Sequence, residues 1–242
     1  MTEETVIDED WDDTPTAMWL RAIFTLLAGA FLLWAQWHAS IDVGSQWARW
    51  VWLAVVANFL LPLGIVWLFF AQGLRRVDYL KNQALNAWNY GWNFRDWKTH
   101  FKWSIGMFLV MLPFVVWQSR DPNSRAAYAN YIANFRDPLG HINPLAMLKF
   151  FALVVVYMAC WEWFHRGFLL FGIAQATGAI PAILLQAILF GAAHLGKPQP
   201  EMIGAFFGGA ILGTIAWRQK SFATAFYTHT LVHIAWLVLL LF

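Results

Sequence analysis

Charged residues are scarce in this sequence. Only 12% of its 242 residues are Asp, Glu, Lys or Arg, whereas about a quarter are charged in a typical soluble domain. Hydrophobic residues make up 60% and the mean hydropathy is +0.50. The formal net charge of +2 is too small to indicate a nucleic-acid partner. The composition therefore argues against an ordinary soluble domain and predicts a helical membrane protein.

Cysteine is also scarce, and a basic run at the N-terminus is missing. The single Cys160 excludes an internal disulfide. Residues 1–16 contain seven acidic residues and no Lys or Arg, whereas a cleavable signal peptide begins with basic residues. We therefore expect no signal peptide and a disordered acidic tail over 1–16. The chain also lacks an internal repeat, which argues against a transporter built from inverted repeats.

Long apolar runs, by contrast, are abundant, and several reach the roughly 20 residues that a membrane crossing needs. Tryptophan residues cluster near the ends of these runs, as in the aromatic belts at membrane interfaces. The pattern predicts an all-α polytopic membrane protein with about seven transmembrane helices. The expected spans are 17–39, 47–72, 103–117, 145–173, 181–195, 202–217 and 222–241.

Two polar segments separate these spans. Residues 73–102 mix Lys and Arg with Trp and Tyr, which predicts an amphipathic helix on an anionic membrane face. Residues 118–143 contain two prolines and are expected to form a loop. The chain thus divides into N-terminal transmembrane helices with this segment and loop, over 17–143, and a four-helix part over 144–242.

Positive charge predicts the orientation in the membrane. The basic residues of 73–102 and of the turn 218–220 fall on the same side if seven helices cross. This places the N-terminus in the cytoplasm and the C-terminus outside. Three arginines in 118–143 are a counter-signal.

A small set of polar residues lies inside the last spans. Glu162 and Arg166 are costly to place in lipid and, four residues apart, share one helical face. The same spacing recurs in the two pairs Phe190–His194 and His229–His233. We expect the three helices to bring these groups together in a water-filled hydrolytic site.

Such a set of residues suits peptide-bond hydrolysis. A carboxylate beside a neutral histidine can take a proton from water, and a further histidine can donate to the oxyanion. The expected roles are Glu162 as general base with His194, Arg166 as the group that orients Glu162, and His229 and His233 at the oxyanion. This chemistry requires no metal.

The motifs Glu162-x-x-x-Arg166-Gly167, Phe190-x-x-x-His194 and His229-x-x-x-His233 together resemble the CPBP family. This family comprises the CAAX prenyl endopeptidases and the bacteriocin-processing and Abi-type intramembrane proteases. Their order and intervals match over about 144–242, which the resemblance identifies as a catalytic core. It implies a glutamic-type intramembrane protease without a cofactor. The residues in and around the motifs are similar to those of a divergent bacterial branch of the family. The expected location is the bacterial inner membrane, and the expected partners are lipid and a hydrophobic or membrane-anchored peptide.

The chain departs from the family pattern at two positions. Trp161 occupies the place of the first motif glutamate, to which the family commonly assigns water activation. Either Glu162 takes that role here or hydrolysis has been lost. His233 stands where the family usually has asparagine, and both side chains can donate a hydrogen bond.

Other interpretations stay open. The chain is alternatively a catalytically silent relative that binds a membrane partner as a maturation, chaperone or immunity factor. A metal-dependent hydrolase with zinc on His194, His229 and His233 is a third class. His165 is expected to face a neighbouring helix or the membrane interface, and Glu201 to cap the sixth helix or to assist at the mouth of the site. The substrate and the oligomeric state are not indicated.

Overall fold

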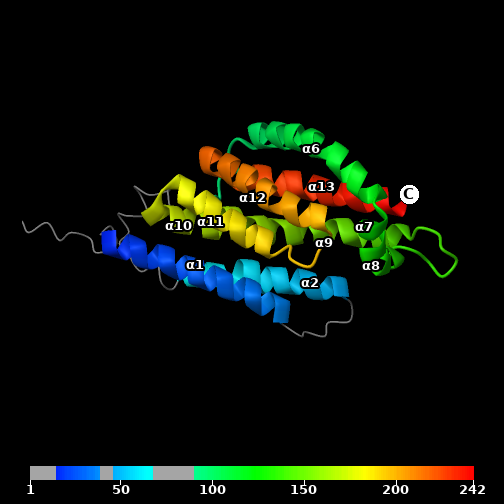
Figure 1. The fold of residues 1–242 in the computed structure, drawn as a ribbon, viewed down its shortest axis with the longest axis horizontal. Helices are drawn as coiled ribbons and strands as arrows, with labels where there is room; N and C mark the ends of the chain where they lie inside the picture. Colours follow the sequence, from blue (N-terminus) through cyan, green and yellow to red (C-terminus); the bar gives the residue numbers. More distant parts are fainter. Residues whose placement is uncertain (1–14, 39–45, 68–89) are drawn as a thin grey trace, which may run out of the picture.

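The computed structural model describes residues 15–38, 46–67 and 90–242. Within these ranges the regular secondary structure is helical, apart from an isolated bridge between Arg136 and Ile142. The long helices run roughly along the longest axis of the molecule (Figure 1). The predicted all-α class is therefore confirmed.

Helices of very different length follow one another along the described parts of the chain. In order they are α1 (Pro15–His38), α2 (Gln46–Val55), the π-helix η2 (Val56–Leu60), α3 (Leu61–Ile65), α6 (Trp97–Arg120), α7 (Pro122–Ala127), α8 (Ala129–Ala133), α9 (Pro144–Glu162), the π-helix η5 (Trp163–Leu169), α10 (Leu170–Thr177), α11 (Ala179–Ala192), α12 (Gln199–Gln219) and α13 (Ala223–Leu241).

Five helices in the described ranges are long and apolar enough to cross a membrane. They are α1, α6, the continuous helix Pro144–Thr177, α12 and α13. Two shorter apolar helices, Arg49–Ile65 and Ala179–Ala192, accompany them. The chain is thus a multi-pass membrane protein, and the count of seven crossings stays a prediction. Residues 1–14 of the expected acidic tail and 73–89 of the expected amphipathic helix lie outside the described residues, whereas Pro15 and Thr16 begin α1.

The third span and the following loop differ from the prediction. α6 begins at Trp97, so residues 97–102 form its first turns instead of belonging to a surface segment. Asp96 caps this helix by accepting a hydrogen bond from the Thr99 N–H (3.3 Å). Hydrogen bonds from the Thr99 side chain and backbone lower the pKa of the Asp96 carboxyl. Much of the expected loop 118–143 is also helical, because α6 continues to Arg120 and α7 and α8 follow.

The fourth span begins where its proline predicts. Pro144 occupies the first turn of α9, where its missing N–H is tolerated. The Asn143 side chain caps the helix by accepting from the N–H groups of Leu145 (3.1 Å) and Ala146 (3.2 Å). At the other end, Gly178 has a φ of +75° and separates α10 from α11.

The continuous helix α9–η5–α10 occupies the middle of the molecule (Figure 1). α1 packs on α10 and α2 on α9, while α13 packs on α9 and carries α6. α11 lies against α12, where Gly209 and Gly213 allow close approach: a Cβ on Gly213 would lie 2.5 Å from the amide nitrogen of Gln186. This arrangement surrounds the motif of the fourth span with helices on several sides.

Candidate active site

The glutamate motif of the fourth transmembrane segment lies across the junction of an α-helix and a π-helix. Glu162 is the last residue of α9, and Arg166 lies in η5. Single π-helical turns inside α-helices are frequent at functional sites. Gly167 allows η5 to pack here, because a Cβ on it would lie 2.7 Å from the Tyr90 carbonyl oxygen. The local geometry therefore depends on the absence of a side chain at this position.

Glu162 is fully buried, and both of its oxygens are engaged. Oε2 lies 2.8 Å from Nη1 of Arg166, and Oε1 lies 2.5 Å from Nδ1 of His229 on α13. Because a carboxylate only accepts, His229 donates from Nδ1. In the neutral imidazole, Nε2 of His229 is then an acceptor. The i, i+4 pair that the spacing predicts is thus present, together with a partner 67 residues away.

Arg166 links this pair to α11. Its guanidinium carbon lies 4.0 Å from the centre of the Phe190 ring, in cation–π geometry. Arg166 is also fully buried. Apart from the ion pair with Glu162, its guanidinium nitrogens have no hydrogen-bond partner among the described residues. Phe190 therefore supports the charged pair through its ring.

His194 lies in the turn after α11, whose last residue is Ala192. We expected it well inside the fifth span, so its position differs from the prediction. The helix ends here because a break follows, with Gly196 at a φ of +81° and then Pro198. Nδ1 of His194 donates to the Phe190 carbonyl oxygen (2.8 Å). Nε2 is consequently left as an acceptor. Only 7% of His194 is exposed.

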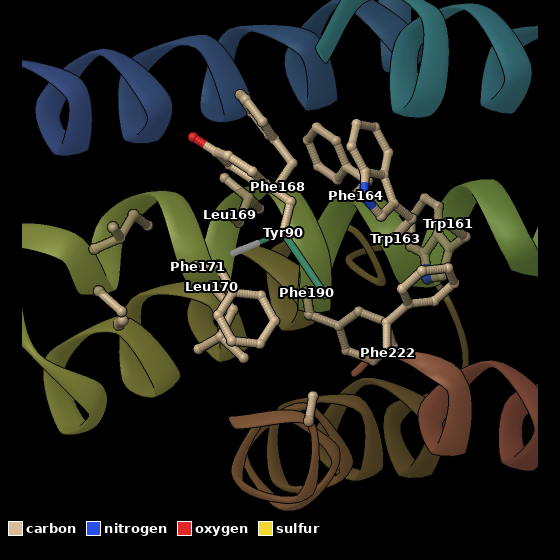
Figure 2. Packing of buried hydrophobic residues seen from close by; sticks show 14 of the residues in the cluster. Tyr90, Trp161, Trp163, Phe164, Phe168, Leu169, Leu170, Phe171, Phe190 and Phe222 are labelled. Atoms are coloured by element: carbon tan, nitrogen blue, oxygen red, sulfur yellow. The ribbon is translucent and has the colours of Figure 1, made fainter. Parts of the chain in front are cut away.

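Trp161 lies beside His194. Their ring centres are 6.1 Å apart, and the Trp161 ring is 6.0 Å from that of Phe190. Figure 2 shows Trp161 and Phe190 in one buried aromatic cluster between the α1–α2 layer and α12–α13. The residue that departs from the motif therefore faces the other motif residues and lines this part of the cluster.

The two histidines of α13 lie in different surroundings. The His229 ring is 5.9 Å from Phe190, and its side chain is 20% exposed. His233, one turn further along, stacks on Phe150 at 5.9 Å, and its Nε2 lies 3.4 Å from the Tyr131 hydroxyl. The structure thus brings His229 to Glu162, while His233 extends the polar set toward α8.

His165 is part of the same cluster. It is fully buried, its Nδ1 donates to the Trp161 carbonyl oxygen (2.9 Å), and its ring lies 5.0 Å from Phe190. It therefore packs against α11, in line with the expected neighbouring helix, but it also lies among the site residues.

Glu201 forms a second, more exposed cluster. Its Oε2 accepts from the Tyr128 hydroxyl and its Oε1 from Nζ of Lys197, each at 2.7 Å. Burial and the nearby Glu201 carboxylate raise the pKa of Tyr128, so the phenol stays a donor. Glu201 lies in the first turn of α12, but its carboxylate joins other elements instead of capping the helix.

Sequence reasoning missed several members of these polar clusters. Lys197 was detectable, because it lies four residues before Glu201 and the two form an ion pair. No sequence signal marks Tyr128 or Tyr131, which reach Glu201 and His233 from the segment expected to be a loop.

The described residues do not supply a metal centre. Within 15–38, 46–67 and 90–242, no three His, Cys, Asp or Glu side chains are grouped so that they could hold a metal ion. The alternative of zinc on the three motif histidines therefore has no supporting ligand set there.

Residues 143–235 match a protein-family model described as "Type II CAAX prenyl endopeptidase Rce1-like". The match extends from the cap of α9 into α13 and includes all three motifs. Neither the curated proteins nor the solved structures gave a match to the chain.

Proposed function

We propose that this chain, whose residues 143–235 match the Rce1-like family model of type II CAAX prenyl endopeptidases, is an intramembrane endopeptidase. Its substrate is a hydrophobic or membrane-anchored peptide or protein segment. The observation that carries the proposal is the buried Glu162 carboxylate, which bridges Arg166 and His229, while His194 and His229 both lie against the Phe190 ring. A charged pair buried in a membrane helix is costly and is generally retained for function.

In this proposal Glu162 acts through His229. Both carboxylate oxygens are occupied, so the proton of the attacking water goes to Nε2 of His229 instead of to Glu162. The resulting hydroxide adds to the substrate carbonyl carbon, and the imidazolium then returns the proton to the leaving amine as the C–N bond breaks. Glu162 fixes the tautomer of His229 and stabilises the imidazolium, and Arg166 keeps Glu162 ionised.

The remaining motif residues complete the site. The Nε2 acceptor of His194 can receive a hydrogen bond from the attacking water, because its Nδ1 is held by the Phe190 carbonyl. The oxyanion that forms on the carbonyl needs a donor, and His233 and the neighbouring Tyr131 hydroxyl are the side chains we assign to it.

A bacterial inner-membrane location with a cytoplasmic N-terminus agrees with this activity. The basic residues that support this orientation are those of 73–102 and 218–220. Tagging each terminus and treating intact cells and spheroplasts with protease tests it. A C-terminal tag that the protease cleaves only after the spheroplasts are lysed would contradict the orientation.

The family description names the class of substrate to test first, a prenylated peptide that ends in a CAAX sequence, and we choose a farnesylated one. The purified protein in lipid should release the terminal tripeptide, as detected by mass spectrometry. We expect Glu162→Gln and His194→Ala to lower the cleavage rate by about 10²–10⁴-fold, the range of general acid–base catalysis. His141→Ala is the matched control, because His141 is an exposed loop residue paired with Asp137. Unchanged cleavage in both site variants would exclude the proposed site.

Trp161 favours a second candidate function. Its ring lies beside His194 where the motif has a carboxylate, and Glu162 and Arg166 are both fully buried. These features suit a catalytically silent relative that binds a membrane helix. In that case the wild type retains a co-purified peptide without cleaving it, and Glu162→Gln retains it equally well. Cleavage gained on Trp161→Glu would show that one carboxylate separates the two functions.

A further inference from the structure

Three histidines surround the Phe190 ring, and each is held by a hydrogen bond from its Nδ1. The centres of the His194, His165 and His229 rings lie 4.7, 5.0 and 5.9 Å from it. Each Nδ1 lies against a group that can only accept: the Phe190 carbonyl for His194 (2.8 Å), the Trp161 carbonyl for His165 (2.9 Å) and the Glu162 carboxylate for His229 (2.5 Å). Each neutral imidazole therefore presents Nε2 as an acceptor.

His165 differs from the other two by its burial. The His229 side chain is 20% exposed and His194 is 7% exposed, whereas His165 is fully buried and its Nε2 has no hydrogen-bond partner among the described residues. An unpaired buried acceptor lowers the stability of the fold. An apolar side chain at this position would avoid that cost, which indicates that the imidazole binds something there.

The next residue, Arg166, lacks hydrogen-bond acceptors for part of its guanidinium among the described residues, whereas His165 lacks a donor. Arg166 is also fully buried, and in the part of the chain that the structure describes its Nε and Nη2 make no hydrogen bond. A molecule that satisfies both residues must donate to His165 and accept from Arg166. Water does both, and internal waters usually bind two to four such groups. A peptide is too large, because His165 packs between the rings of Trp161, Phe164 and Phe190.

We propose that His165 Nε2 and the Arg166 guanidinium hold an internal water molecule in the Phe190 cluster. It donates one hydrogen bond to His165 and accepts one from Arg166. A second step, which rests on the proposed function, is that this water supplies the hydrolytic water to His194 and His229 around the same ring. His165 is then a positioning residue that acts through the water.

The water itself is tested without any substrate. Protein labelled with ¹⁵N-histidine and reconstituted in lipid is studied by solid-state NMR, with His165 assigned by the signal lost in His165→Gln and His141→Gln as the control. We expect an unprotonated Nε2 that accepts a hydrogen bond and shows magnetisation transfer from water protons. An unbonded or protonated Nε2 without contact to water overturns the site. If His165→Gln does not fold, glutamine variants of the other six histidines assign the His165 signal by elimination; these are His38, His100, His141, His194, His229 and His233.

The role of the water is tested by cleavage of the farnesylated peptide. His165→Phe should lower kcat on the order of 100-fold, as expected for a misplaced reactant, with little change in KM. His165→Gln, whose side chain retains an acceptor oxygen, should restore part of the rate. Normal kcat in His165→Phe, with the water seen in the wild type, overturns only the second step. Absence of cleavage by the wild type itself contradicts the proposed endopeptidase and leaves the NMR result to decide the water site.

Discussion

Glu162 and Glu201 are built alike but lie in different surroundings. Each carboxylate binds a cation four residues away on its own segment, Arg166 or Lys197. Each also accepts from a donor on a distant element, His229 for the first and Tyr128 for the second. The Glu162 pair is fully buried, whereas the side chains of Lys197 and Glu201 are 42% and 21% exposed.

The difference in burial changes what each cluster can contribute. An exposed ion pair is screened by water and stabilises a protein by about 0–1 kcal/mol. A buried pair pays a desolvation cost that its own attraction only partly offsets, and removal of one partner leaves an unpaired charge. The Glu201 cluster is therefore interpreted as a clamp that joins α12 to the α7–α8 segment, whereas the Glu162 centre is the catalytic site that we propose.

The largest effect is expected for Glu162→Gln. Besides the loss of cleavage, this change leaves Arg166 buried without its counter-charge and should lower stability by about 3–5 kcal/mol. Thermal or denaturant unfolding of the protein in detergent measures it, with Glu201→Gln as the matched control. Equal unfolding of the two variants would mean that the two carboxylates do not differ in the way their burial indicates.

A smaller loss is expected when the π-helix beside Glu162 is disturbed. Gly167→Ala places a Cβ 2.7 Å from the Tyr90 carbonyl oxygen and should destabilise the protein by about 1–3 kcal/mol through overpacking. Gly106→Ala in α6 is the control, because no atom lies within 4 Å of its added Cβ. If both alanine variants unfold like the wild type, the tight packing of η5 on Tyr90 is not a requirement of the site.

The smallest effect is expected for Glu201→Gln. The amide can still accept from the Tyr128 hydroxyl, and the lost pair with Lys197 is partly exposed. We expect a change in unfolding free energy below about 1 kcal/mol and a cleavage rate close to that of the wild type. A loss of cleavage comparable to that of Glu162→Gln would move Glu201 from the clamp into the catalytic set.

Much of the fold could be predicted from local patterns. Apolar runs located the long helices, and Pro144 marked the start of α9. The predictions were wrong where a helix cap or a short helix, and not the apolar run, sets the boundaries of an element. Asp96 caps α6 earlier than the apolar run begins, and the proline-containing segment 118–143 forms α7 and α8. Hydropathy alone does not detect a capping hydrogen bond or a short helix that packs on its neighbours.

Some contacts of the candidate site could also be predicted from the sequence, and others could not. Residues four apart on one helix are neighbours whatever the rest of the chain does, so the contact between Glu162 and Arg166 follows from the sequence. Spacing does not say which helices pack together. The contact of Glu162 with His229, and the gathering of three histidines and Arg166 around the Phe190 ring, depend on how α13 and α11 pack on the fourth span. The sequence thus determined which charged and polar groups lie inside the membrane helices, and only the tertiary structure decided which of them meet.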